Sequence, residues 1–255
     1  MSTQEFDGSY LLPLFAQADR LRGNGVYRPL PTPASSSSLA TDDKPLGPWR
    51  AAHLIQVSYG AGLAHLDAFR RLTLAGEIDP TSPWTLMRGA LENFATGIWL
   101  LHGKDRAERR HRALSLWHED MRNRAQHEDD TGHQPAPGGK TGTERRREIA
   151  DLAHSLGLPN LTAPRTTVLL EQAAPAAGLD PVSTRAAWRA ASGYAHGRYW
   201  PNIRTAQPRA AYESGTDSYM LAMVIDEAQH RPLTEYCGTM LRHLHARYHS
   251  RSIPS

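Results

Sequence analysis

The chain has 255 residues, 40% hydrophobic and 22% charged, a balance typical of a globular protein with a sizeable core. Its formal net charge is only +3, and no window approaches the roughly 18 consecutive apolar residues of a membrane span, so no membrane association is expected. A single cysteine, Cys237, excludes an internal disulfide. The N-terminal residues lack the basic start of a secretory signal, and we therefore expect a cytoplasmic protein.

The first 47 residues predict a short helix, over residues 4–21, followed by a flexible linker. The linker sequence is rich in glycine, proline and serine, and reads RGNGVYRPLPTPASSSSLATDDKPLGP. Such a composition has little apolar surface to bury, so we expect an arm that is either mobile or draped over the body. The rest of the chain, residues 48–255, is predicted to form a single all-α domain.

Residues 48–102 predict two long helices. The first ends at Gly76, a residue suited to the left-handed position after a helix, and the second begins at Ser82-Pro83. The second helix is apolar nearly all round, and its main stripe consists of Met87, Leu91, Phe94, Ile98 and Leu101. We expect this helix at the centre of a bundle.

Helix-start signals continue along the rest of the chain, at Asp105 with Glu108, Thr141 with Glu144 and Asp180 with Pro181. A short helix is predicted over residues 166–177, and a last one over residues 216–248 with Pro232 as a kink or break. No segment alternates as a strand with hairpin glycines would. The prediction is an all-α bundle of about six to eight helices.

Two charges stand out within the central apolar helix. Arg88 and Glu92 are the only charged residues between Pro83 and Leu101, and their i,i+4 spacing places them on one face. Charges that are partly buried must be paired, so the spacing predicts an internal ion pair. The alternative is that Glu92 faces a polar cavity as a base or as the partner of a histidine.

A second candidate site lies in the stretch WRAASGYAHGRYW, which belongs to a region, residues 181–212, with five arginines and no acid. Arg189 and His196 are two helical turns apart, so both point the same way about 10 Å apart and could bracket a phosphate. The candidate substrate contacts around them are Ser192, Tyr194, Arg198, Trp200 and Arg204. The alternative interpretation is that the rings are core residues and that His196 ends a helix capped by Gly197.

Other candidate sites are weaker. Arg122 and His127 have suitable chemistry, but on an unbroken helix they face different sides and converge only if the helix ends between them. His245 and His249 have the i,i+4 spacing of metal ligands without the glutamate of H-E-x-x-H, so no metal site is expected. No Walker loop, G-x-G-x-x-G or G-x-S-x-G motif is present, and no cofactor is predicted.

Three segments carry a family resemblance: LMRGALENFATGIWLL, DRAERRHRALSL and WRAASGYAHGRYW. Together they resemble a group of actinobacterial helical proteins of unknown function, which are similar in turn to the HEPN superfamily of nucleotide-binding helical domains. HEPN ribonucleases carry an arginine followed by histidine after four to six residues, usually with a polar residue directly after the arginine. Arg189 and His196 match that spacing but have Ala190 after the arginine, whereas Arg122, Asn123 and His127 match both features outside the three segments.

The resemblance implies a HEPN-like fold, a homodimer and metal-independent cleavage of single-stranded RNA. His196 would then be the acid and base, and Arg189 would hold the phosphate. The alternative function is a non-catalytic helical binding or interaction module, in which the arginines and His196 form a structural cluster.

Overall fold

The computed structural model of the chain describes residues 8–23, 26–76, 79, 81–201, 211–213, 219–221 and 227–254. Its helices are η1 (Gly8–Leu11), α1 (Leu12–Arg20), α2 (Ser38–Asp43), η2 (Lys44–Leu46), α3 (Ala51–Ala75), α4 (Ser82–Leu101), α5 (Arg106–Thr131), α6 (Gly142–Ser155), α7 (Thr166–Ala176), α8 (Pro181–Ala195) and α10 (Glu227–Ser252). Two short antiparallel hairpins pair β1 (Arg22–Gly23) with β2 (Val26–Tyr27) and β3 (Ala211–Glu213) with β4 (Tyr219–Leu221). The all-α prediction is confirmed, but the described residues contain more helices than the predicted six to eight, and the expectation of no strand hairpin is wrong for these two short pairs. None of the described helices is long and apolar enough to cross a lipid bilayer.

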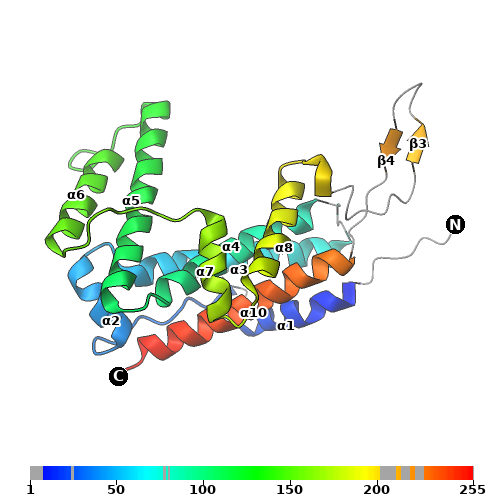
Figure 1. Ribbon diagram of the computed structural model, residues 1–255, viewed down its shortest axis with the longest axis horizontal. Helices are drawn as coiled ribbons and strands as arrows, with labels where there is room; N and C mark the ends of the chain where they lie inside the picture. The colour runs from blue at the N-terminus through cyan, green and yellow to red at the C-terminus, as the bar shows by residue number, and fades with distance from the viewer. Residues whose placement is uncertain are drawn as a thin grey trace.

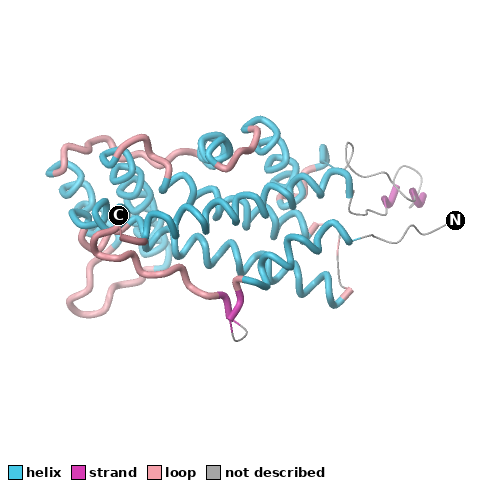
Figure 2. Tube along the Cα trace, turned by 90° about the horizontal axis from the view of Figure 1, so that it is seen from below, coloured by secondary structure: helices cyan, strands magenta, loops and turns pink. Residues whose placement is uncertain are grey.

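Helix α4 is the centre of the bundle, as its apolar sequence predicts. It packs against α3, α10, α7 and α8, and all five residues of its predicted stripe are fully buried. The long helices α3, α4 and α10 and the short α1 run side by side along the molecule, while α5 rises steeply from one end with α6 beside it (Figures 1 and 2). Residues on α4 can therefore meet partners from several other helices.

Two glycines allow the central helices to approach one another closely. A Cβ atom at Gly62 of α3 would overlap the ring of Phe94, and one at Gly97 of α4 would lie 2.8 Å from Leu244 of α10. Because such contacts are shorter than packing permits, larger residues at these positions would push α4 away from its neighbours.

Residues 27–47, for which the sequence predicts a mobile or draped linker, lie against the helical body. Leu30, Leu39 and Leu46 are buried. These three leucines supply enough apolar surface to hold the segment against the body, although its overall composition is polar and rich in proline. The carboxylate of Asp43 accepts hydrogen bonds from the first amides of α3, Ala51 at 2.8 Å and Ala52 at 3.1 Å. The segment thus caps a core helix.

The predicted helix starts agree well with the structure, and the last helix agrees less well. Asp105, Thr141 and Asp180 each cap a helix through a side-chain oxygen. The expected helix over residues 216–248 is wrong at its start, because Tyr219–Leu221 form β4. Pro232, expected to kink or break the last helix, lies inside α10, so the helix does not break there.

Candidate functional site

The candidate site is built where α8 ends on α4. The carboxylate of Asp180 caps α8 by accepting a hydrogen bond from the amide of Ser183 at 2.7 Å. The helix stops at Ala195 because Gly197 takes a φ of 60°, a conformation that suits glycine. His196 is left at the C-terminal end of the helix, where it is exposed to solvent.

A cluster of four side chains joins the two helices; we call it the α4–α8 cluster, and it consists of Arg88, Glu92, Trp188 and His196. One carboxylate oxygen of Glu92 accepts hydrogen bonds from Arg88 Nε at 2.7 Å and from Trp188 Nε1 at 2.6 Å. The Arg88 guanidinium also lies 5.6 Å from the centre of the Trp188 ring, within cation–π range. The ion pair that the i,i+4 spacing predicts is therefore present, and it also fastens α8.

His196 enters the cluster through Arg88, whose Nη1 lies 3.3 Å from His196 Nε2. Arginine can only donate, so this hydrogen bond requires a neutral imidazole that accepts at Nε2 and carries its proton on Nδ1. The stretch around His196 has no acid of its own, but Arg88 links His196 to the carboxylate of Glu92 on the neighbouring helix. The sequence could not show this, since residues 88 and 196 are 108 positions apart.

The other predicted site residues differ in burial: some lie at the surface and one lies in the core. Arg189 is exposed and, within the described part of the chain, forms no hydrogen bond or ion pair with His196. Tyr194, a predicted substrate contact, is buried and stacks on Trp84 with ring centres 4.5 Å apart, so it belongs to the core. Ser192 is half-buried, Arg198 and Trp200 are exposed, and Arg204 lies outside the described residues.

The rival pair, Arg122 and His127, does not converge. Both lie on α5, which runs unbroken from Arg106 to Thr131, so the helix does not end between them as convergence would require. Arg122 instead pairs with Glu119 at 2.5 Å on the surface.

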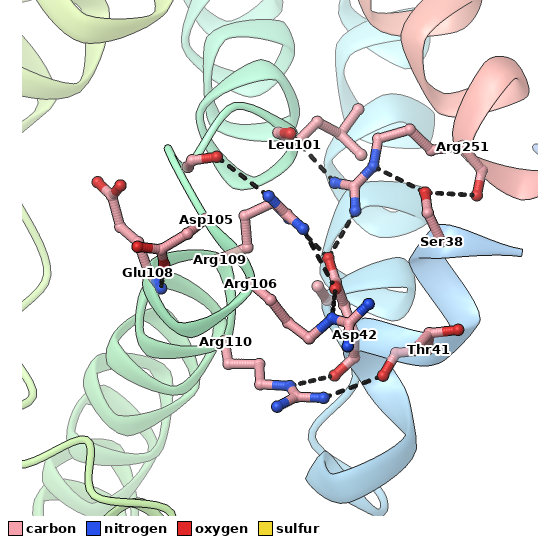
Figure 3. Close-up of polar contacts among 12 residues, drawn as sticks. Ser38, Thr41, Asp42, Leu101, Asp105, Arg106, Glu108, Arg109, Arg110 and Arg251 are labelled. Atoms are coloured by element: carbon pink, nitrogen blue, oxygen red, sulfur yellow. Dashed lines mark hydrogen bonds and ion pairs between the residues drawn. The ribbon is translucent and has the colours of Figure 1, made fainter.

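A second polar cluster, centred on Asp42, was not predicted from the sequence. The carboxylate of Asp42 is almost fully buried and accepts hydrogen bonds from Arg106, Arg109 and Arg251, at 3.1, 2.6 and 2.5 Å (Figure 3). Arg110 donates to its main-chain oxygen at 2.9 Å. Burial alone would raise the pKa of Asp42, but the hydrogen bonds from Arg109 and Arg251 outweigh it and hold that pKa below its ordinary value.

The arginine-rich start of α5 was the available signal for this cluster. The segment DRAERRHRALSL contains four arginines and two acids. The sequence does not show that Asp42, 64 residues before Arg106, is the acid that these arginines contact. Because Asp42 saturates its acceptor capacity with protein donors, we interpret the cluster as a structural junction of α2, α5 and α10.

A histidine pair lies at the junction of α4 and α10. His102 Nε2 and His243 Nε2 are 2.7 Å apart, and burial, reinforced by His243 and nearby arginines, lowers the pKa of His102 to about 4. Within the residues that the structure describes, no three histidine, cysteine, aspartate or glutamate side chains are grouped to hold a metal ion.

Glu92 also lines a cavity of about 400 Å³, which is bounded by Asn93, Thr96, Leu116, Glu119, Ala163, Pro164, Arg165, Thr166 and Leu169. Within the α4–α8 cluster, Glu92 therefore borders this cavity and His196 is exposed to solvent. The comparisons with known proteins found no matching family model, no matching curated protein and no matching solved structure.

Proposed function

We propose that the surface at the C-terminal end of α8 binds single-stranded RNA and cleaves it without a metal ion. The observation that carries the proposal is the exposed His196 ring, with the Arg88 guanidinium 3.3 Å from its Nε2 atom. An imidazole beside an arginine combines a proton acceptor with a group that stabilises phosphate charge. The proposal also draws on the resemblance to HEPN ribonucleases.

The residues that follow His196 suit a single-stranded nucleic acid. Tyr199 is 70% exposed and Trp200 is 45% exposed, so both rings present faces on which bases can stack. Arg189 and Arg198 are exposed on the same part of the chain and would contact phosphates. Binding through these groups should weaken steeply with salt.

The proposed reaction begins when a backbone phosphate draws the Arg88 guanidinium away from His196. The freed Nε2 of His196 then takes the proton of the 2′-hydroxyl, whose oxygen attacks the adjacent phosphorus. The bond to the 5′-oxygen breaks, and that oxygen receives a proton from the imidazolium, which leaves a 2′,3′-cyclic phosphate and a 5′-hydroxyl. In the homodimer implied by the resemblance, the second protomer would face this site and share the strand.

The test is incubation of labelled single-stranded RNA with the protein in EDTA at low salt. We expect His196→Gln to reduce the cleavage rate at least about 100-fold, the low end of general acid–base contributions, with RNA binding changed less than about threefold. His127→Gln is the matched control on an exposed helix and should cleave like the wild type. No cleavage by the wild type, or equal cleavage by His196→Gln, would remove the ribonuclease assignment.

One observation favours a second function, a non-catalytic binding module. Glu92, Arg88 and Trp188 hold α8 to α4, and His196 extends this network as a structural residue would. In that case His196→Gln should lower the melting temperature, and RNA or another anion should bind without being cut. If His196 is catalytic, replacing it with glutamine should leave the melting temperature unchanged or raise it.

A further inference from the structure

The cavity that Glu92 borders lies between α4, α5 and the start of α7, and we call it the α4–α5–α7 cavity. Its volume of about 400 Å³ is in the range of small-molecule sites. The lining combines an apolar part with charged groups of both signs. The apolar part is formed by Leu116, Ala163, Pro164 and Leu169, and the charged part by Glu92, Glu119 and Arg165.

The two carboxylates of the cavity each keep one oxygen free to accept. Oε1 of Glu92 accepts from Arg88 and Trp188, and Oε1 of Glu119 accepts from Arg122. No hydrogen bond to Oε2 of either carboxylate is seen in the described part of the chain. The two side chains are 28% and 35% exposed, so a ligand can reach them. Both carboxylates can therefore accept a further hydrogen bond from a donor inside the cavity.

Arg165 supplies a positive charge at the same cavity. It precedes the first residue of α7, its side chain is exposed, and it does not cap the helix. Its guanidinium forms no hydrogen bond or ion pair with any residue that the structure describes, whereas Glu92 and Glu119 each have an arginine partner. The cavity thus offers one unpaired cation together with two free acceptor oxygens. A matching ligand carries an anionic group and hydrogen-bond donors.

An α-amino acid in its zwitterionic form presents both kinds of group in one small molecule. Its ammonium group has three N–H donors, as a lysine side chain has, and the cavity offers three acceptors. Two are the free oxygens of Glu92 and Glu119. The third is the side-chain oxygen of Asn93, whose Nδ2 is already used as a donor to the main-chain oxygen of Gly89 at 2.8 Å. The carboxylate of the amino acid would pair with Arg165.

We propose that the α4–α5–α7 cavity binds a free α-amino acid with an aliphatic side chain. That side chain would lie against Leu116, Pro164 and Leu169. A carboxylic acid without an amino group would bring no donor to the two glutamates, and an amine without a carboxylate would leave Arg165 unpaired. The site shares Glu92 with the α4–α8 cluster but does not depend on cleavage of RNA.

Leucine is the probe for the first experiment, and two analogues each lack one of its charged groups. 4-Methylpentanoate is leucine without the amino group, and 3-methylbutylamine is leucine without the carboxylate. Titration calorimetry of the full chain should show saturable binding of leucine at least about tenfold tighter than that of either analogue, since a charge-assisted hydrogen bond is worth at least that factor. No saturable binding of leucine, or equal binding of all three compounds, would overturn the proposal.

Two variants outside the α4–α8 cluster assign the contacts. Glu119→Gln should weaken leucine binding about tenfold and leave 4-methylpentanoate unaffected, because that analogue has no ammonium group. Arg165→Gln should also weaken leucine binding about tenfold, but it should leave 3-methylbutylamine unaffected. Both side chains are at least partly exposed, so both variants should fold.

The matched controls carry the same substitutions at exposed positions away from the cavity. Glu235→Gln on α10 and Arg147→Gln on α6 should bind leucine like the wild type. If Glu119→Gln or Arg165→Gln also binds leucine like the wild type, leucine does not bridge these two side chains and the site is refuted.

Discussion

Asp42 joins parts of the chain that are far apart in sequence. Its arginine partners Arg106, Arg109 and Arg251 are 64, 67 and 209 residues away, and Arg251 also donates to the main-chain oxygen of Leu101 at 3.1 Å (Figure 3). No local pattern encodes such contacts, because they exist only once α2, α5 and α10 are packed. The Arg88–Glu92 pair, by contrast, could be predicted, since both residues lie on one face of one helix.

Replacing Asp42 tests how much this junction stabilises the fold. Asp42→Asn keeps the size of the side chain but leaves buried arginines without a counter-charge, so we expect a loss of about 3–5 kcal/mol in the free energy of unfolding. Urea denaturation monitored by circular dichroism measures the loss. Asp129→Asn, at an exposed position on α5, should change stability by less than about 0.5 kcal/mol. A loss below about 1 kcal/mol at Asp42 would contradict the role of its charge.

At the scale of helices, local signals predict where an element begins and which face it buries. The caps at Asp105, Thr141 and Asp180, and the buried stripe of α4, follow from short-range chemistry. The strand β4 and the ordered segment 27–47 do not, because their pairing and burial depend on distant neighbours. For the same reason the sequence placed His196 at the end of a helix without identifying Arg88 as its partner.

The attachment of α8 to α4 is the element-scale feature that positions His196. Trp188→Phe keeps an aromatic ring but removes the donor to Glu92, so we expect a loss of about 2 kcal/mol in the free energy of unfolding. Trp200→Phe is the matched control, because the Trp200 ring is 45% exposed and no hydrogen bond of its indole is seen in the described structure. Equal losses in the two variants would show that the bond to Glu92 does not stabilise the junction.

The whole molecule should lose stability in acid because it buries histidines that stay neutral when folded. His230 is fully buried among Tyr10, Phe69 and Trp84, and this burial lowers its pKa to about 4. His102 has a pKa lowered to about 4 as well, mainly by burial. In the unfolded chain both residues protonate near a pKa of about 6.5. Between these two values the unfolded state therefore binds more protons than the folded state.

The contribution of these two histidines to the free energy of unfolding should consequently be fully present above about pH 6.5. It should be lost progressively as the pH decreases toward 4. Each of these histidines contributes a slope of up to about 1.4 kcal/mol per pH unit in that window. Denaturation at a series of pH values between 7.5 and 4.5 measures the slope. Asp42 acts in the same direction at the acid end, because its pKa is depressed and its contribution is lost as the pH falls through the folded-state value.

His230→Gln isolates the contribution of one histidine to this slope. The variant should be less stable than the wild type at pH 7, because it disturbs the aromatic packing and the hydrogen bond that joins the Tyr10 hydroxyl to His230 Nδ1 at 2.8 Å. Its stability should nevertheless fall less steeply with decreasing pH, since glutamine has no proton to gain. His127→Gln, at an exposed position on α5, should retain the slope of the wild type. If His230→Gln and the wild type have the same slope, protonation of His230 does not limit the acid stability of this fold.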